Sequence, residues 1–433
     1  MDSVWFVFLF LPAVILLNYI TPTRFRSIII TLSSIVFLLL VDPYMLPLML
    51  VFVFVDYLLG VFVEKSKQNL AKKLLVTLSI LFNSAVFILS QYITAFPIVL
   101  GVSVVSLVKV SYIFDINSGK ISAERNIFSY LSAVLCFPCL YYGPIQSLSS
   151  VSYMIRSGKE TLANFGSGAS LFIYGLFKKV IISDMLYTML DKLYPSVNTT
   201  IGAWMWIIFS ILAFYYLLLG YSQMAQGLCK MLGFKVNQNF SFPFMAGSVT
   251  EFFRRFNIGL AEFVRKYVYI QFGGNRHGVV CLICSVSASC IVMSLWYGFS
   301  LNKVVAALFF AIIIVVEKTI FNNFKRLPFK ILHCIFTYVY LFVGFTLFLT
   351  SSATEASTLL STAFGLQNSA LYDNGVLSCI FEYLPILIAS VLMIFDFLKK
   401  INRAIQKKKS VFLNVLFVCF NLVVLFVCTA YIL

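Results

Sequence analysis

Few residues of this 433-residue chain offer an imidazole for acid–base or metal chemistry, because it contains two histidines, His277 and His333. His277 lies in the string GGNRHG, which is typical of a turn at the membrane surface, and His333 opens an apolar run beside Lys330. A histidine in either setting more often has a solvated or packing role than a catalytic one. We therefore expect the chemistry of the protein not to depend on these two side chains.

Ten cysteines offer a second kind of candidate. Two pairs have C-x-x-C spacing, Cys136 with Cys139 and Cys281 with Cys284, and such spacing occurs in redox and zinc sites. No histidine, aspartate or further pair lies near enough in the sequence to complete a tetrahedral set, and buried thiols act as small hydrophobic groups. The sequence predicts no metal site and no bound cofactor.

A segment over residues 248–267 combines aromatic and basic residues. Ser248 and Glu251 have the S-x-x-E spacing that begins a helix. One apolar face then recurs at helical spacing, formed by Phe252, Phe256, Leu260, Phe263 and Tyr267, and the basic residues are Arg254, Arg255, Arg265 and Lys266. We predict one amphipathic helix at the cytoplasmic interface, with cations that suit lipid head groups or an anionic substrate.

The composition shows what must position these residues. Hydrophobic residues make up 61% of the chain and charged residues 11%, whereas soluble domains have about 25% charged residues. Apolar runs near the length of about 20 residues that spans a bilayer occur at 3–20, 27–41, 44–63, 75–92, 94–113, 168–185, 203–220, 279–297, 301–316, 330–350, 376–397 and 411–431. The sequence predicts one all-α, membrane-embedded domain over residues 1–433, with about twelve spans.

The net formal charge of +16 is explained by topology, because Lys and Arg concentrate in cytoplasmic loops and attract anionic lipids. The basic loops alternate with the Lys- and Arg-poor segments 186–202 and 351–375. Both termini are then expected outside the cytoplasm, provided that the apolar stretch 127–142 enters and leaves the membrane by one face. The first run lacks a basic leader, so we expect a retained helix. Nucleic acid is not an expected partner, since the aromatic residues lie inside the spans.

Acidic residues within apolar runs are costly, by about 2.5–3.5 kcal/mol at the centre of a bilayer on insertion scales. Asp115, Asp184 and Asp396 fall at predicted span ends. Asp56 and Glu382 lie deeper, and we expect each to pair with Lys or Arg. No regular set of acids lines successive spans, which argues against a proton-coupled transporter.

Several strings give the chain a resemblance to the membrane-bound O-acyltransferases. It is most similar to the bacterial branch that acetylates alginate and other exopolysaccharides or D-alanylates teichoic acid. The strings are DYLLG at 56–60, SYIFD at 111–115, FPCLYYGPI at 137–145, GLFKKVIISD at 175–184, GYSQMAQGLCKMLGF at 220–234, TEFFRRFNIGL at 250–260, YVYIQFGGNRHG at 267–278 and SLWYGFS at 294–300. Residues 301–433 match more loosely. The resemblance implies a bundle of about 11–12 transmembrane helices with re-entrant and amphipathic interfacial helices.

The family's chemistry needs a base that takes a proton from an acceptor hydroxyl as it attacks a thioester. The resemblance gives that role to a histidine in a W-H-G string and adds a second histidine in a W-H-I-S string. Tyr297 and Asn257 occupy these two positions here. Further polar residues of the alginate-type pattern are also replaced: Leu217 and Leu219 stand for Asp and Ser, Gln223 for Asp, and Leu349 for Arg.

By this resemblance the acyl donor is acyl-CoA or an acyl carrier protein on the cytoplasmic side. We expect Arg254, Arg255 and Arg265, together with Gln223 and Trp296, to contact substrate. The expected location is the bacterial cytoplasmic membrane. Besides the lipid bilayer, the implied partners are a periplasmic SGNH-type acyltransferase or a polysaccharide synthase.

Three functions stay open at this point. The first is acylation, chiefly O-acetylation, of an extracellular or cell-envelope polysaccharide. The second is a catalytically inert homologue that acts as a binding or assembly module, which the replaced residues favour. The third is a transporter of lipid-linked sugar. Whether the protein is an enzyme therefore depends on Tyr297.

Overall fold

The computed structural model describes residues 1–41, 43–44, 46–92, 99–140, 142–276, 278–320, 327–367, 369–394 and 411–433, and all regular structure among them is helical. The chain divides into two compact units. The first comprises Met1–Phe172 and Tyr221–Asn239, and the second comprises Ile173–Gly220 and Phe240–Leu433. The all-α expectation is confirmed, and the single domain stays a prediction.

The first unit is built mainly from the N-terminal helices. After a π-helical turn, Phe6–Phe10, they are α1 (Leu11–Ile20), α2 (Arg26–Val41), α3 (Leu46–Lys65), α4 (Asn69–Tyr92), α5 (Val99–Asn117), α6 (Ile127–Val134), α7 (Phe137–Leu140) and α8 (Leu148–Ser157). Most of α9 (Leu162–Phe177) and the last part of α11 (Thr200–Met231) also belong to this unit. Within it, α3 and α4 both pack against α5.

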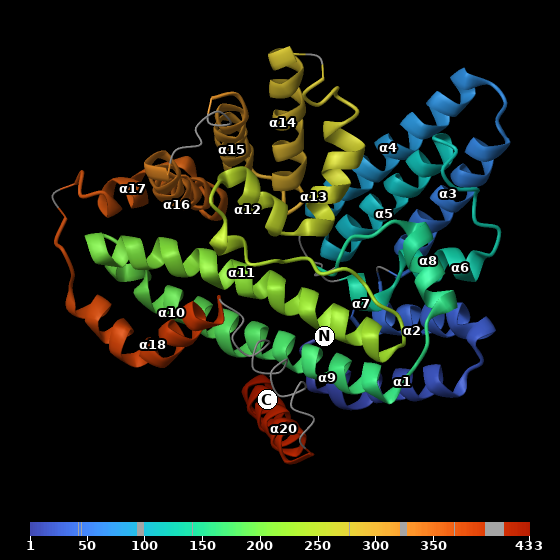
Figure 1. The fold of residues 1–433 in the computed structure, drawn as a ribbon, viewed down its shortest axis with the longest axis horizontal. Helices are drawn as coiled ribbons and strands as arrows, with labels where there is room; N and C mark the ends of the chain where they lie inside the picture. Colours follow the sequence, from blue (N-terminus) through green and yellow to red (C-terminus); the bar gives the residue numbers. More distant parts are fainter. Residues whose placement is uncertain are drawn as a thin grey trace. The chain divides into compact units, whose positions relative to one another are not determined.

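The second unit holds the remaining helices. They are α10 (Asp184–Leu193), most of α11, α12 (Val249–Arg255), α13 (Ile258–Val264), α14 (Gly278–Leu295), α15 (Leu301–Thr319), α16 (Leu327–Leu349), α17 (Ala353–Ala363), α18 (Asn374–Met393) and α20 (Val411–Ile432). The helices α14 and α15 pack side by side, and α16 packs on α15 (Figure 1).

Seven of the described helices are long and apolar enough to cross a membrane. They are Thr23–Val41, Leu46–Lys65, Asn69–Ser90, Thr200–Met231, Gly278–Leu295, Asn374–Met393 and Val415–Ile432, and each overlaps a predicted span. Three shorter apolar helices, Phe6–Ile20, Ile127–Leu140 and His333–Leu349, fall within other predicted apolar stretches. The protein is a multi-pass membrane protein of the all-α class.

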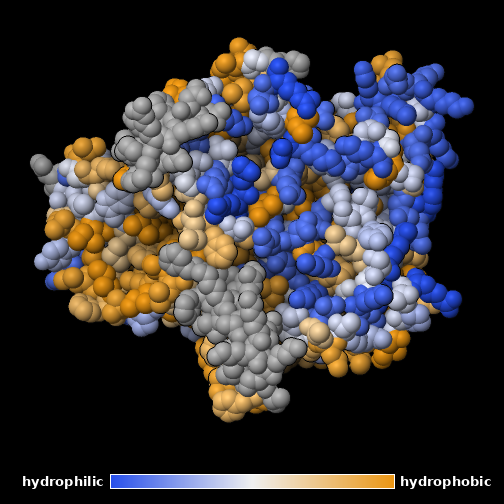
Figure 2. All heavy atoms as spheres, in the orientation of Figure 1, coloured by the Kyte–Doolittle hydropathy of each residue, from blue (hydrophilic) through white to orange (hydrophobic). Residues whose placement is uncertain are grey.

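The surface of α18 shows how these helices face lipid. Leu377, Phe381, Leu384 and Ile388 recur along one side of the helix, and all four side chains are exposed. Figure 2 shows hydrophobic residues gathered over α18. A stripe of this kind is unfavourable in water and favourable in hydrocarbon, where the helix satisfies its own backbone groups.

The helix α11 is longer than the predicted span 203–220. The predicted span ends at residue 220, but the helix continues to Met231. Close helix packing accounts for the extension, because Gly168 of α9 and Gly227 of α11 meet without side chains between them. A Cβ atom built on Gly168 would lie 2.8 Å from the carbonyl oxygen of Gly227. Small residues allow backbones to approach in this way.

Two glycines of α9 test this packing. Gly168→Ala should destabilise the protein by about 1–3 kcal/mol, because the added methyl group overpacks the contact with α11. Gly166→Ala is the matched control, since a Cβ atom there meets nothing within 4 Å and alanine favours helix by about 1 kcal/mol. The measurement is the unfolding midpoint in detergent. Equal midpoints for the two variants would contradict the close approach.

A buried ion pair joins two apolar helices of the first unit. Lys109 Nζ lies 2.8 Å from Asp56 Oδ2, and neither side chain is exposed. Lys109 also donates to the carbonyl oxygen of Phe52, at 2.7 Å. Ser79 and Asn83 of α4 both donate to the Asp56 carboxylate. The expected pairing of Asp56 with a basic residue is confirmed, and the carboxylate links α3, α4 and α5.

Two of the other acids, Glu382 and Asp184, also lie beside basic side chains. Glu382 pairs with Lys192, as expected, although both side chains are about half exposed rather than deep. Asp184 Oδ2 lies 2.9 Å from Lys179 Nζ. Asp396 lies outside the described residues. Together these pairs agree with acids that stabilise the bundle rather than carry protons.

Removing one member of the buried pair should be more harmful than removing both. Asp56→Leu should cost about 3–5 kcal/mol, because it leaves the Lys109 ammonium buried without its counter-ion. The double variant Asp56→Leu with Lys109→Met should recover most of this loss, and Ser79→Ala should cost about 1 kcal/mol. Unfolding midpoints in detergent test this order. A double variant less stable than Asp56→Leu would refute the pairing.

Candidate functional site

The second unit contains a cavity of about 510 Å³. Its lining comes from α12 to α16, with Phe214 added from α11. Most of the wall is apolar or aromatic, and the charged side chains among the described lining residues are Arg254, Arg265 and Lys318. A largely apolar pocket with a few polar groups is the usual form of a small-molecule site.

The segment that supplies much of this wall is not the single amphipathic helix predicted from the sequence. It forms α12, a break at Phe256 and Asn257, then α13, followed by a π-helical turn at Arg265–Tyr269. Asn257 has φ 50° and ψ 60°, in the left-handed region, which asparagine tolerates better than most residues. The predicted apolar face is confirmed in its burial: Phe252, Phe256, Leu260 and Phe263 are all buried.

The start of α12 is held by two carboxylates. The Ser248 side chain accepts from Glu251 N at 3.1 Å, as the S-x-x-E spacing predicts. Glu251 in turn accepts from Gly247 N at 2.8 Å; this hydrogen bond, with the Arg255 guanidinium, holds the pKa of Glu251 below its usual value. Glu317 of α15 accepts from Val249 N at 2.8 Å. A carboxylate at a helix N-terminus is favourable because free amide groups point toward it.

The break after α12 brings Asn257 and Tyr297 together. Asn257 Nδ2 donates to Tyr297 Oη at 2.7 Å, although 40 residues separate them. Asn257 is almost fully buried, and its Oδ1 has no hydrogen-bond partner among the described residues. A buried acceptor without a partner costs free energy, and Asn257 is not among the described residues that line the cavity.

Tyr297 lies in the turn between α14 and α15. Backbone bonds from Tyr297 N to Ser294 O and from Gly298 N to Leu295 O form the turn. Gly298 has φ 128°, a conformation that glycine adopts at no steric cost. Lys303 Nζ donates to the Tyr297 carbonyl oxygen at 2.9 Å. The phenol is therefore positioned by backbone bonds on one side and by Asn257 on the other.

Aromatic rings fix the orientation of the Tyr297 ring. Its centroid lies 4.7 Å from the ring centroid of Trp296, 5.4 Å from that of Phe214 and 5.6 Å from that of Phe348, and all three pairs are edge-to-face. Such contacts are each worth about 0.5–1.5 kcal/mol beyond the area they bury. The phenol oxygen is thus held in a nearly apolar setting at the cavity wall.

The predicted substrate-binding residues divide into two groups. Arg254 and Arg265 line the cavity. Arg255 instead pairs with Glu251, and Lys266 lies beside the Tyr267 hydroxyl at 2.6 Å. Trp296 is buried next to Tyr297 and is not among the described lining residues.

Gln223, the remaining predicted substrate-binding residue, is buried in the first unit and is not among the described residues that line the cavity. His333 Nε2 lies 3.5 Å from Glu317 Oε1, and His277 lies outside the described residues. No described lining residue of the cavity is a histidine, aspartate or glutamate.

Two residues of the site were missed in the sequence. Lys318 belongs to one of the basic loops whose charge was explained by membrane topology. Its side chain nevertheless lines the cavity, and its Nζ lies 3.4 Å from the Tyr269 hydroxyl. Glu317 anchors α12 to α15 through three hydrogen bonds. The available signal was the adjacent Glu-Lys pair at the end of an apolar run, which predicts a span end but not these contacts.

Comparison with known proteins agrees with the strings read from the sequence. Residues 26–353 match the model of the membrane-bound O-acyltransferase family. The probable alginate O-acetylase of Pseudomonas fluorescens is 29% identical over 380 residues, which cover 85% of this chain and 76% of the relative. The peptidoglycan O-acetyltransferase of Helicobacter pylori is 23% identical over 420 residues, which cover 84% of this chain and 80% of the relative.

A third relative covers less of the chain. The teichoic acid D-alanyltransferase of Bacillus subtilis is 22% identical over 241 residues, which cover 52% of this chain and 60% of the relative. The family match extends over α2 to α16, which include every helix that lines the cavity. It covers well over half of the sequence, and the chain therefore belongs to the membrane-bound O-acyltransferase family.

Proposed function

We propose that the protein transfers an acyl group, chiefly acetyl, from a thioester donor to hydroxyl groups of a bacterial cell-envelope polysaccharide. The family and the names of its relatives support this reaction. The observation that carries the proposal is the cavity in which Tyr297, hydrogen-bonded to Asn257, shares a wall with three cationic side chains.

The cations suit the donor. Arg254 and Arg265 are exposed at the edge of the cavity, and Lys318 is half-buried. Guanidinium groups bind phosphate in a bidentate geometry, and lysine binds it as a point charge. Acyl-CoA and the phosphopantetheine arm of an acyl carrier protein both combine phosphate with an uncharged chain that ends in the thioester. The apolar part of the cavity suits that chain.

Tyr297 fits the role of a hydrogen-bond donor better than that of a base. A phenol with an ordinary pKa of about 10 is ionised to roughly one part in a thousand at pH 7. Because Asn257 Nδ2 donates to the phenol oxygen, the hydroxyl proton is directed away from Asn257. In the proposed step the acceptor oxygen attacks the thioester carbon, and the Tyr297 hydroxyl stabilises the resulting oxyanion. The C–S bond then breaks, and the acceptor's proton ends on the leaving sulfur.

A second function is favoured by one specific observation. The described cavity lining holds no imidazole or carboxylate that could take the acceptor's proton, and a positioned base is worth about 10²–10⁴ in rate. This supports the alternative of an inert homologue that binds a donor or carrier protein and assembles the pathway. No observation in the structure favours a transporter of lipid-linked sugar.

The proposed setting is the bacterial cytoplasmic membrane, with both termini outside the cytoplasm and the cationic edge of the cavity on the cytoplasmic side. Transfer to a polysaccharide outside the cell then requires a partner on the far side. A periplasmic SGNH-type acyltransferase or a polysaccharide synthase fits this requirement.

Removal of the phenol oxygen of Tyr297 tests its role. If the full chain in nanodiscs transfers acetyl from acetyl-CoA to a glycan acceptor, Tyr297→Phe should lower kcat about 10²–10³-fold. The KM for the donor should be unchanged, since the phenol acts on the developing oxyanion. Tyr187→Phe, on α10 and outside the cavity lining, is the control.

Two results would decide between the functions. Transfer by the wild-type chain above the rate without protein supports the acyltransferase. If the wild-type chain binds the donor but transfers no acyl group, either from acetyl-CoA or from an acylated carrier protein, the result would instead support the inert homologue. Activity of Tyr297→Phe equal to that of the wild type would remove Tyr297 from the mechanism.

The cations make a separate prediction about donor binding. Arg254→Gln and Arg265→Gln should each raise the KM for acyl-CoA about tenfold, because a hydrogen bond to a charged group is worth about 1.5–3 kcal/mol. The effect should shrink at high salt, and kcat should change little. Arg24→Gln, an exposed residue of the first unit, is the control. Unchanged KM values in both cavity variants would place the phosphates elsewhere.

A further inference from the structure

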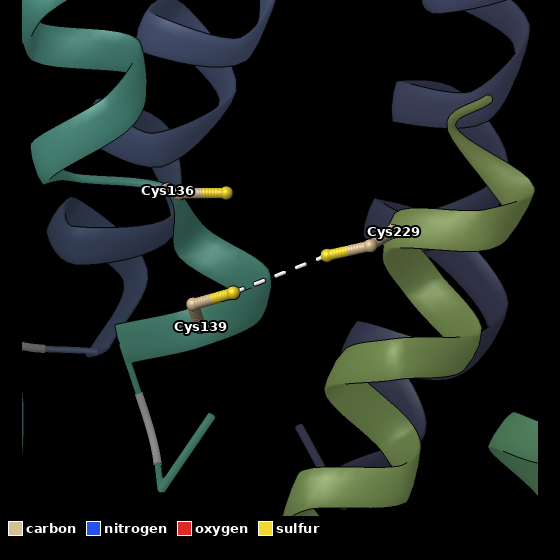
Figure 3. A group of neighbouring side chains, drawn as sticks. All are labelled: Cys136, Cys139 and Cys229. Atoms are coloured by element: carbon tan, nitrogen blue, oxygen red, sulfur yellow. Dashed lines mark hydrogen bonds between the residues drawn. The ribbon is translucent and has the colours of Figure 1, made fainter. Parts of the chain in front are cut away.

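Three buried cysteines converge in the first unit at a site that the proposed acyl transfer does not use. Cys136 comes from the segment that joins α6 to α7, Cys139 comes from α7, and Cys229 comes from α11 (Figure 3). Their sulfur atoms all lie within 4.8 Å of one another, and those of Cys139 and Cys229 are 4.0 Å apart. The sequence showed the first pair but gave no sign of the third member, 90 residues away.

The C-x-x-C turn is rigidly held. Cys139 N donates to Cys136 O at 2.8 Å, which closes the turn between the two thiols. Phe137, inside the turn, donates its backbone N–H to Ser34 Oγ at 3.1 Å, and its ring packs edge-on against Phe10 at 5.4 Å. These contacts fix the two sulfur atoms before any ligand arrives, so little conformational entropy is lost when an ion binds.

The spacing of the sulfur atoms matches that of a coordinated ion. Three thiolates that each lie about 2.3 Å from one ion are about 4.0 Å apart in a trigonal plane and about 3.8 Å apart in a tetrahedron. The distance of 4.0 Å between Cys139 and Cys229 agrees with either arrangement. All three sulfur atoms lie within 4.8 Å of one another, so small side-chain shifts bring every pair to these distances.

The donor set selects the class of ion. All three donors are sulfur, and no described histidine, aspartate or glutamate joins the group. Thiolates prefer soft cations such as Cu(I) and Zn(II) over Mg²⁺ or Ca²⁺. Three ligands complete a trigonal Cu(I) site, whereas Zn(II) adds a fourth ligand. We propose that Cys136, Cys139 and Cys229 bind one thiophilic d¹⁰ cation, Cu(I) or Zn(II).

Charge balance accompanies binding. Each thiolate ligand forms when a thiol loses its proton, and an uncompensated charge in a buried site is costly. Three thiolates require the loss of three protons, which leaves a net charge of −2 around Cu(I) and −1 around Zn(II), so the buried setting favours the divalent ion. The bound ion would tie the α6–α7 turn to α11, so it should raise the stability of the folded chain by mass action.

The test uses the reduced full chain in detergent, loaded anaerobically with Zn(II) or Cu(I) and washed with a competing chelator. Metal content is measured by mass spectrometry, and X-ray absorption reports the ligands. We expect one ion per chain in a sulfur-only shell and a higher unfolding midpoint with metal. Cys136→Ser, Cys139→Ser and Cys229→Ser should each lose the ion. Cys428→Ser, a buried thiol outside the group, should keep it.

Three outcomes would overturn the proposal, and the first two do not depend on a variant folding. One is folded wild-type protein that retains neither metal after washing. Another is a disulfide between two of the three cysteines in protein isolated without oxygen, found by mass spectrometry after alkylation. The last is metal retained by Cys139→Ser at the wild-type level. Zn(II) and Cu(I) are distinguished by which element survives the chelator.

Discussion

The constraint on which the structure depends is that hydrocarbon offers no hydrogen-bond partners. Every backbone amide and carbonyl within the apolar region must then be satisfied inside the chain, and helices do this locally. The same constraint acts on polar side chains. Asp56 is buried because Lys109, Ser79 and Asn83 all reach its carboxylate, and Glu317 is buried because it accepts the free amide groups of α12.

The candidate site and the three-cysteine cluster both lie where helices are interrupted. The break between α12 and α13 places Asn257 in a left-handed conformation, and the turn after α14 places Tyr297 opposite it. In the first unit, Cys136 lies in the interruption between α6 and α7, and Cys139 follows in α7. A helix interior directs side chains outward at fixed intervals, whereas a break lets neighbouring residues point to one place. Asn257 and Tyr297 meet in this way although neither a shared helix nor sequence proximity brings them together.

Local features of the site followed directly from the sequence. The S-x-x-E spacing identified the start of α12, and the aromatic period identified the face that Phe252, Phe256 and Leu260 bury. The break at Asn257 was not predicted, because an apolar period continues across it and asparagine carries no strong helix-breaking signal. The extension of α11 to Met231 was missed for the opposite reason, since polar residues such as Ser222 are buried by packing that hydropathy does not describe.

The sequence by itself determined the class of the protein, because composition and apolar run length require an all-α membrane protein and the ordered strings identify its family. It also identified Tyr297 and Asn257 as candidate site residues. Only the tertiary structure decided which distant residues meet: Asn257 with Tyr297, Glu317 with the start of α12, and Cys229 with the C-x-x-C turn. The physical reason is that periodicity and capping act over a few residues, whereas these contacts depend on how helices pack, which no local pattern records.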